Sequence, residues 1–322
     1  MTASLPRHVQ DVFHRFVTTE YVTVDRHGQP IVWPVTPYYR PGDETIDVTT
    51  GVGYPKKALD ARHHPSVALL FSEPKGSGIA SGIRVLVQGT AEVDDRDLAA
   101  NRERYAREVR EKLPVTEREQ PPRLLRGLLK WYDERIYVKV RPERVFAWPG
   151  GGDAGAAEIH DARLEEVRSG HIEEPEAERP PAAGGAVEWD ERVDALGGRH
   201  PAAVLAWVAP DGFPLAARVG VSSDPEARRV RIGSLPEDLP VLEGRACLTA
   251  HDHAPDFSWR ENFQLRGDLT RDGDGWSLVP RKLLGGLELP RESGFARMRR
   301  GLSYTRRYRA RRRQVLAERE RG

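Results

Sequence analysis

The feature that most constrains the fold of this chain is a pattern of predicted strands that occurs twice. In each copy, a strand, a turn containing Gly-x-Pro and a second strand come first, followed by a short apolar strand and then a strand with one internal glycine. The paired segments are residues 23–35 and 207–219, residues 66–71 and 245–250, and residues 85–93 and 262–270. Three matches in the same order and at similar spacing favour an internal duplication.

The repeated pattern predicts a mainly β chain with some helices, divided into four parts. Residues 1–151 form the first β unit, and residues 191–292 form a second, more degenerate one. Residues 152–190 are rich in glycine, proline and glutamate, which is typical of a linker. Residues 293–322 are strongly basic with interleaved apolar side chains, which favours a helix that packs on the β units with its arginines in water. Nucleic-acid binding by this segment is the less favoured alternative.

Composition excludes several classes of protein. The chain is 39% hydrophobic and 31% charged, and it contains no run of eighteen apolar residues, so we expect a globular protein without a membrane span. The N-terminal segment lacks the apolar region of a signal peptide. The only cysteine, Cys247, excludes an intrachain disulfide and any site with several cysteine ligands. Together these features favour a cytoplasmic location.

Two histidine pairs raise the question of a metal site. His63 and His64 are neighbours on a predicted helix and do not share a face, and no third ligand lies at a suitable spacing. His251 and His253 lie two residues apart at a strand end and could share a face, so a metal or haem ligand is an alternative there. Exposed histidines are the more frequent case, and we predict no metal.

The segment TTGVGYPKKALDARHHP, residues 49–65, has the properties of an anion site. Thr49 and Thr50 end a predicted strand, two glycines follow, and Lys56 and Lys57 stand in the first turn of a predicted helix. Free backbone N–H groups, glycines and a fixed cation are what a phosphate requires. The helix dipole disfavours lysine at this end of a helix, and a bound anion would explain why two lysines stand there. A solvated turn is the alternative interpretation, and the second copy of the pattern lacks the lysines.

With its neighbours, this segment resembles the FMN-binding split-barrel family, which includes pyridoxamine 5′-phosphate oxidase and the flavin- and deazaflavin-dependent oxidoreductases. The resemblance rests on TTG after a strand, the lysine pair, HP before a buried strand, VLVQGTAEV, and RPERVFAWPGG. It covers Thr18–Gly151 well and Arg199–Pro290 in degraded form. It implies two tandem split β-barrels that form a pseudo-dimer within one chain, as a monomer or a homodimer.

The resemblance also implies which residues hold the cofactor. Residues 33–36 would lie along the isoalloxazine ring, the residues from 49 to 57 would hold the phosphate, and Gln88 would face the cofactor from the fifth strand. The full set is Trp33, Pro34, Val35, Thr36, Thr49, Thr50, Gly51, Lys56, Lys57 and Gln88. Trp259, Arg260 and Asn262 of the second unit are candidates for the opposite wall. We expect one competent site, because only the first unit keeps the lysines.

The predicted function is hydride transfer between FMN and a small substrate, with NAD(P)H as a possible partner. F420 is the alternative cofactor. The chain lacks the arginine–x–lysine pair of pyridoxamine phosphate oxidases and has no match to their pyridoxal phosphate-binding residues, so that specific activity is not expected. No catalytic residue is assigned, because the cofactor would carry the chemistry. A rival of another class is a non-catalytic flavin- or haem-binding protein, in which His251 or His253 would matter.

Overall fold

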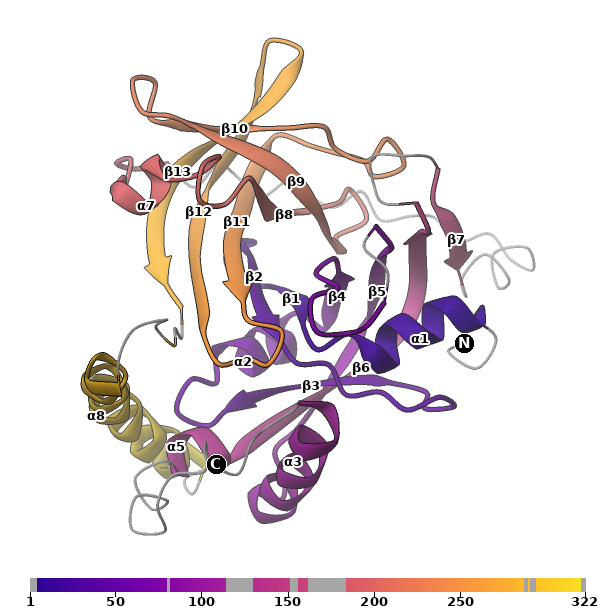
Figure 1. The fold of residues 1–322 in the computed structure, drawn as a ribbon, viewed down its shortest axis with the longest axis vertical. Coiled ribbons are helices and arrows are strands. Elements are labelled where there is room, and N and C mark those ends of the chain that lie inside the picture. Colours follow the sequence, from indigo (N-terminus) through magenta and orange to yellow (C-terminus); the bar gives the residue numbers. More distant parts are fainter. Residues whose placement is uncertain are drawn as a thin grey trace.

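The computed structural model describes residues 5–79, 82–113, 130–150, 156–161, 184–286, 289 and 294–319. They form two β units that pack against each other, with helices mainly on the first unit (Figure 1). The first unit contains α1 (Arg7–Arg15), β1 (Thr19–Val24), β2 (Pro30–Val35), β3 (Ile46–Gly51), α2 (Lys56–His63), β4 (Ser66–Phe71), β5 (Arg84–Asp94), α3 (Leu98–Lys112), α5 (Lys130–Asp133), β6 (Arg135–Trp148) and β7 (Glu158–Asp161). The second contains α7 (Glu191–Asp194), β8 (Ala202–Val208), β9 (Pro214–Asp224), β10 (Arg229–Ile232), β11 (Gly244–His253), β12 (Arg260–Asp272) and β13 (Gly275–Gly285), followed by α8 (Gly294–Arg319).

The two sheets have the same strand order. The first runs β2-β1-β4-β5-β6-β3, and the corresponding strands of the second run β9-β8-β11-β12-β13-β10. The second closes into a barrel through β10 and β9, whereas the first closes only by an isolated bridge between Tyr38 and Asp47. The predicted mainly β fold with two paired units and a C-terminal helix is therefore confirmed.

Strand β4 shows how the two units come to share a core. Its odd residues, such as Leu69, join a core inside the first unit, whereas the even ones, such as Leu70, join a core that continues into the second unit. Because successive side chains of a strand point to opposite faces, both faces of β4 are covered by protein. The nearly unbroken apolar run of this strand follows from that double burial.

Buried polar groups also join the units across this contact. The Thr249 hydroxyl and the Gln264 side-chain amide both donate to the carbonyl of Val32, at 2.8 and 2.6 Å. The Gln29 side-chain amide donates to the carbonyl of Ala246 at 2.9 Å. Since an unpaired buried carbonyl is costly, these bonds fix the position of one unit on the other.

Each unit carries a β-bulge at its internal glycine. The register of β5 on β6 shifts between Gln88 and Gly89, and that of β12 on β13 shifts between Arg266 and Gly267. A Cβ on Gly89 would lie 2.2 Å from the carbonyl oxygen of Arg141, and a Cβ on Gly267 would make the same clash in the second unit. These close backbone approaches explain why glycine stands at both positions.

We expect Gly89→Ala to lower the free energy of unfolding by more than about 1 kcal/mol, because the backbone of Arg141 cannot move away cheaply. Gly220→Ala is the matched control, since a Cβ there meets no atom closer than 3.9 Å. Urea denaturation of both variants measures the difference. Equal unfolding midpoints would contradict this account of the bulge.

Helix α8 packs beside α5 on the first unit, at the lower left in Figure 1. Arg312 makes two 2.7 Å bonds to the Glu134 carboxylate, and Val315 is buried. Other arginines of the helix, such as Arg309, are exposed, as the packed-helix prediction requires. Within the described residues, no helix is long and apolar enough to cross a membrane.

The predicted linker lies mostly outside the described residues. Its described part includes β7, a short strand that pairs with β6 and that the sequence pattern did not indicate. Residues 114–129 also lie outside the described part of the chain, which resumes at Lys130 in α5.

Candidate functional site

A cavity of about 280 Å³ lies between the two units, close to the lower end of the usual range for small-molecule sites of roughly 300–1,000 Å³. The end of β2, the β3–α2 segment and tyrosines of the helices line it from the first unit, and the end of β11, the start of β12 and Phe257 of the loop between them line it from the second. The lining includes Thr18, Trp33, Pro34, Val35, Thr36, Thr49, Lys56, Lys57, Tyr132, Arg135, His251, His253, Arg260, Asn262 and Tyr308.

The turn between β3 and α2 holds the lysine pair at the cavity. The Thr50 hydroxyl donates to the carbonyl of Tyr54 at 2.8 Å, which fixes the turn after β3. Pro55 caps the helix, so Lys56 and Lys57 are its first two residues. The Lys56 amine is 2.9 Å from the carboxylate of Asp60, so its charge already has a partner.

Lys57 differs from its neighbour in burial and in pairing. Its side chain is half-buried, and its amine lies 5.9 Å from the centre of the Tyr54 ring. Among the residues that the structure describes, it forms no hydrogen bond or ion pair. Burial, assisted by the charge of Arg135, lowers the pKa of Lys57 to about 8. Lys57 is therefore the cation of the pair that is available to a ligand.

Arg135 is a second cation in this cavity, and no sequence pattern indicated it. It is buried, with 4% of its surface exposed, and it donates to the hydroxyls of Tyr54 and Tyr105 at 2.7 Å each. Its guanidinium lies 4.0 Å from the ring centres of Tyr105 and Tyr132. No carboxylate in the described part of the chain pairs with it, and its Nε–H is buried without a partner. A buried donor of this kind favours an anionic ligand.

The cations around the cavity change the pKa of Tyr132. Burial acts to raise the pKa of its phenol, but the charges of Arg135 and Arg260 outweigh burial and lower that pKa to about 7. Arg260 comes from the second unit, so both units set the charge state of the phenol. The cations around the cavity therefore favour the ionised form of this phenol.

We expect one tyrosine to ionise near pH 7, seen as tyrosinate absorbance in a pH titration, and Tyr132→Phe to remove that transition. Saturating phosphate should move the transition to higher pH, because a bound anion opposes a second negative charge nearby. Tyr137→Phe is the control, since the Tyr137 hydroxyl donates to Glu108 and its pKa is raised. A titration without any transition below about pH 9 would contradict the effect of these cations on Tyr132.

Most of the predicted cofactor-binding residues line this cavity, but three do not. Thr50 is used by the turn, and Gly51 pairs with Arg135 in the β3–β6 ladder. Gln88 lies at the contact between the units, where it donates to the carbonyl of Pro214 at 3.1 Å and accepts from Arg144 at 3.0 Å. The structure therefore places Gln88 away from the cavity, in a contact that joins the two units.

The second unit provides two of its three predicted wall residues. Arg260 and Asn262 line the cavity, whereas Trp259 does not. Asn262 is buried, and its Oδ1 has no hydrogen-bond donor among the described residues. Asn262 is therefore a residue of the cavity wall whose acceptor the described residues leave unused.

The second unit does not repeat the cationic turn. Glu237 and Asp238 stand where the first unit has its lysine pair, and Asp238 accepts a 2.8 Å bond from the backbone N–H of Ala157. The indole of Trp148 lies 3.4 Å from the same carboxylate. This part of the second unit is therefore acidic and is already occupied by residues next to β6 and β7.

The two histidines of β11 differ in their hydrogen bonds. His253 uses both ring nitrogens, 3.1 Å from the Thr18 hydroxyl and 2.9 Å from the carbonyl of Ala254. Within the described residues, His251 makes its contacts through Nε2, which lies 2.8 Å from the carboxylate of Glu20 and 2.9 Å from the guanidinium of Arg218. His63 and His64 lie elsewhere, beside a separate cavity on α2. No group of three residues suited to a metal occurs in the part of the chain that the structure describes.

The fold and the site define a mainly β protein with a seven-stranded sheet, a closed six-stranded barrel and a cationic cavity between them. No family model and no curated protein matches the sequence. Similar solved structures include an F420 reductase, with 18% identity over 44% of this chain and 98% of the other and a TM-score of 0.33. Others are a putative pyridoxamine 5′-phosphate oxidase from Listeria innocua (15% identity, 44% and 94%, TM-score 0.30) and general stress protein 26 from Bacillus anthracis (14% identity, 48% and 98%, TM-score 0.30). They are split-barrel proteins, the kind that the sequence resembles, and each matches about half of this chain. At this level of similarity they carry no function to it.

Proposed function

We propose that the cavity binds the phosphate and ring of FMN, and that the protein is a flavin-dependent oxidoreductase acting on a small substrate. The observation that carries the proposal is the pairing of Lys57, which has no anionic partner among the described residues, with the buried and unused Nε–H of Arg135. Two unneutralised donors beside the Thr49 hydroxyl form a suitable place for a phosphate.

The residues of the cavity fit the rest of this cofactor. Trp33 and Pro34 provide an apolar surface for a ring at the end of β2. The unused Asn262 Oδ1 suits an N–H donor such as the imide of a flavin. A cavity of about 280 Å³ encloses only part of a molecule of this size, so the remainder would extend beyond it.

In this function the protein would bind the cofactor, orient its ring and shield the ring from water. When bound, FMN would supply hydride transfer, which is chemistry of the cofactor. Lys57, Thr49 and Arg135 would hold the phosphate, and Asn262 would fix the orientation of the ring. Tyr308 of α8 also lines the cavity, so the C-terminal helix would help to exclude water from one side.

Absorbance of the purified protein and titration with FMN test this proposal. We expect flavin bands near 370 and 450 nm (approximate values that belong to the cofactor) or uptake of added FMN with quenching of its fluorescence. Preferential uptake of F420 would assign the cavity to F420, the alternative cofactor, instead of FMN. Uptake of haem with a histidine ligand would support the non-catalytic rival. A protein that binds none of the three would overturn the proposal.

A further inference from the structure

A buried carboxylate and a histidine from different units meet beside the cavity. Glu20 of β1 is fully buried, and His251 of β11 lines the cavity with only 2% of its side chain exposed. The Glu20 carboxylate lies 2.8 Å from His251 Nε2. The residues are 231 positions apart in sequence, so only the contact of the two units forms this pair.

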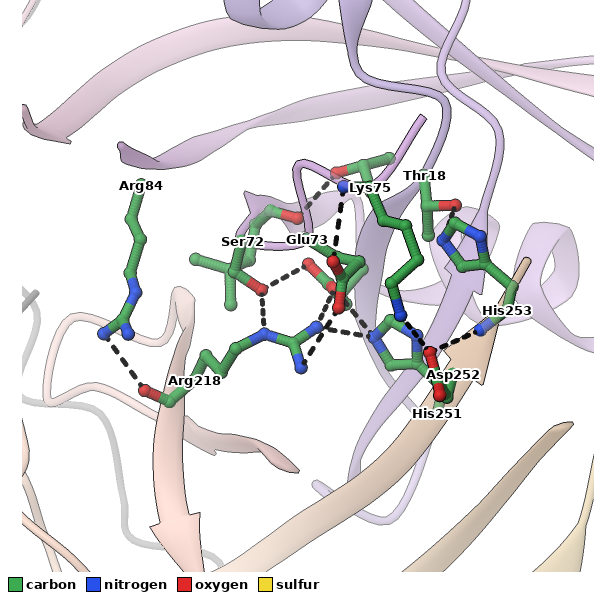
Figure 2. A network of polar contacts seen from close by, with 12 residues as sticks. Thr18, Ser72, Glu73, Lys75, Arg84, Arg218, His251, Asp252 and His253 are labelled. Atoms are coloured by element: carbon green, nitrogen blue, oxygen red, sulfur yellow. Dashed lines mark hydrogen bonds and ion pairs between the residues drawn. The ribbon is translucent and has the colours of Figure 1, made fainter. Parts of the chain in front are cut away.

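The carboxylate is fixed from several sides. Arg218 of β9 lies 2.9 Å from Glu20, and the Ser72 hydroxyl donates to Glu20 at 3.1 Å. Figure 2 shows Arg218 extended between Ser72 and His251. Burial acts to raise the pKa of Glu20, but the hydrogen bond from His251 and the charge of Arg218 outweigh burial and lower it. Glu20 is therefore ionised.

The charge on Glu20 determines how the histidine is protonated. Two groups lie close to His251 Nε2: the Glu20 carboxylate at 2.8 Å, which only accepts, and the Arg218 guanidinium at 2.9 Å, which only donates. The same Arg218 nitrogen donates to Glu20 at 2.9 Å, and a lone pair on Nε2 would face the ionised carboxylate unfavourably. The arrangement therefore assigns the proton to Nε2, which donates to Glu20. In the neutral ring this leaves a lone pair on Nδ1. Nδ1 has no hydrogen-bond partner within the described residues, in contrast to the Nδ1 of His253, which is bonded to Ala254. Charged groups that lie around this pair are Arg218, Glu73, Lys75 and Asp252.

We propose that His251, oriented by Glu20, exchanges a proton through Nδ1 with the molecule bound in the cavity. The lone pair of Nδ1 takes a proton from an N–H or O–H group of the ligand, which leaves the conjugate base of the ligand and an imidazolium. Glu20 stabilises that imidazolium across the Nε2–H bond, and the reverse step returns the proton. The proposal deepens the proposed function and rests on its claim that a small molecule binds here.

The first test needs no ligand. Diethyl pyrocarbonate attacks unprotonated and accessible ring nitrogens, and cleavage after Arg245 and Arg260 releases a peptide, residues 246–260, that contains His251 and His253. We expect one modification of this peptide in the wild-type protein and in His253→Gln, and none in His251→Gln. Failure to modify the wild-type peptide, or modification that persists in His251→Gln, would overturn the proposal.

The second test adds FMN as the probe. Bound FMN should protect the peptide, and calorimetry in two buffers of different ionisation enthalpy should give a number of linked protons that changes in His251→Gln but not in His253→Gln. If FMN binds and neither effect occurs, His251 has no role in proton exchange and the flavin proposal stands. If FMN does not bind, the flavin proposal fails, and the peptide modification alone decides whether His251 presents a reactive Nδ1.

Discussion

Lys57→Met is expected to weaken FMN binding by about 10- to 150-fold, which corresponds to the roughly 1.5–3 kcal/mol of one hydrogen bond to a charged group. Lys57 is half-buried in the cavity and has no anionic partner in the described residues, so its charge is available to the phosphate. Methionine keeps much of the length and the apolar contact with Tyr54. Fluorescence titration with FMN measures the change.

The chain offers a matched control in the adjacent residue. The Lys56 amine is 2.9 Å from Asp60 and 3.7 Å from Asp25, so Lys56→Met should change FMN affinity by much less. Equal losses in the two variants would point to a general loss of positive charge. Unchanged affinity in Lys57→Met would reject the phosphate assignment.

The pH dependence of FMN binding provides a second test of the same assignment. The pKa of Lys57 is lowered to about 8, so above that pH the amine loses its proton and its attraction for an anion. The Tyr132 phenol, with a pKa of about 7, gains negative charge over a similar interval. Both changes make the cavity less positive, so its affinity for FMN should fall between about pH 7 and pH 9. Lys57→Met should flatten the upper part of this profile.

Arg218→Met is expected to lower the free energy of unfolding by about 3–5 kcal/mol, the usual cost of removing one partner of a buried ion pair. Glu20 is fully buried, and the Arg218 guanidinium donates to its carboxylate at 2.9 Å. The same guanidinium also donates to the Ser72 hydroxyl. Without the guanidinium, a buried carboxylate keeps only His251 and Ser72 as partners. Urea denaturation at neutral pH measures the effect.

Two variants make this prediction sharper. Arg231→Met removes an exposed ion pair with Asp224 and should change the urea midpoint far less than Arg218→Met does. Glu20→Gln combined with Arg218→Met should be more stable than Arg218→Met alone, because the unpaired charge is gone. A small effect of Arg218→Met would show that water reaches Glu20.

The stability of the protein at low pH provides an independent check on the contribution of ionised Glu20. Its pKa is lowered on folding, so its contribution to stability is complete above the ordinary carboxyl pKa of 4.5 and is lost as the pH falls through the folded value. Glu20→Gln should therefore remove part of the acid sensitivity of the wild-type protein.

Much of the fold could be predicted from the sequence, because local patterns carry it. The apolar run of residues 66–71 indicated a buried strand, and the internal glycines at 89 and 267 matched in the two copies of the pattern. That each glycine lies at a β-bulge was shown only by the structure. The lysine pair indicated one cationic turn. The pattern could not show that Asp60 neutralises Lys56, because that depends on side-chain packing around α2.

The remaining site residues could not be predicted, because no local sequence pattern indicates them. Arg135 begins an ordinary strand, and only its packing against two tyrosine rings makes it a buried cation that pairs with no carboxylate in the described residues. Gln88 was assigned to the cofactor from its place in the fifth strand, but that face of β5 meets the second unit.

The sequence by itself determined a mainly β chain of two similar units, with one cationic turn in the first. Strand periodicity and turn residues act over a few positions, so a single sequence is enough to read them. The tertiary structure decided which charges meet: Lys57 with Arg135 and Arg260 around one cavity, and Glu20 with His251 beside it. These groups lie far apart along the chain, and their chemistry depends on burial and on distances of a few ångström, which only the packing of the two units sets.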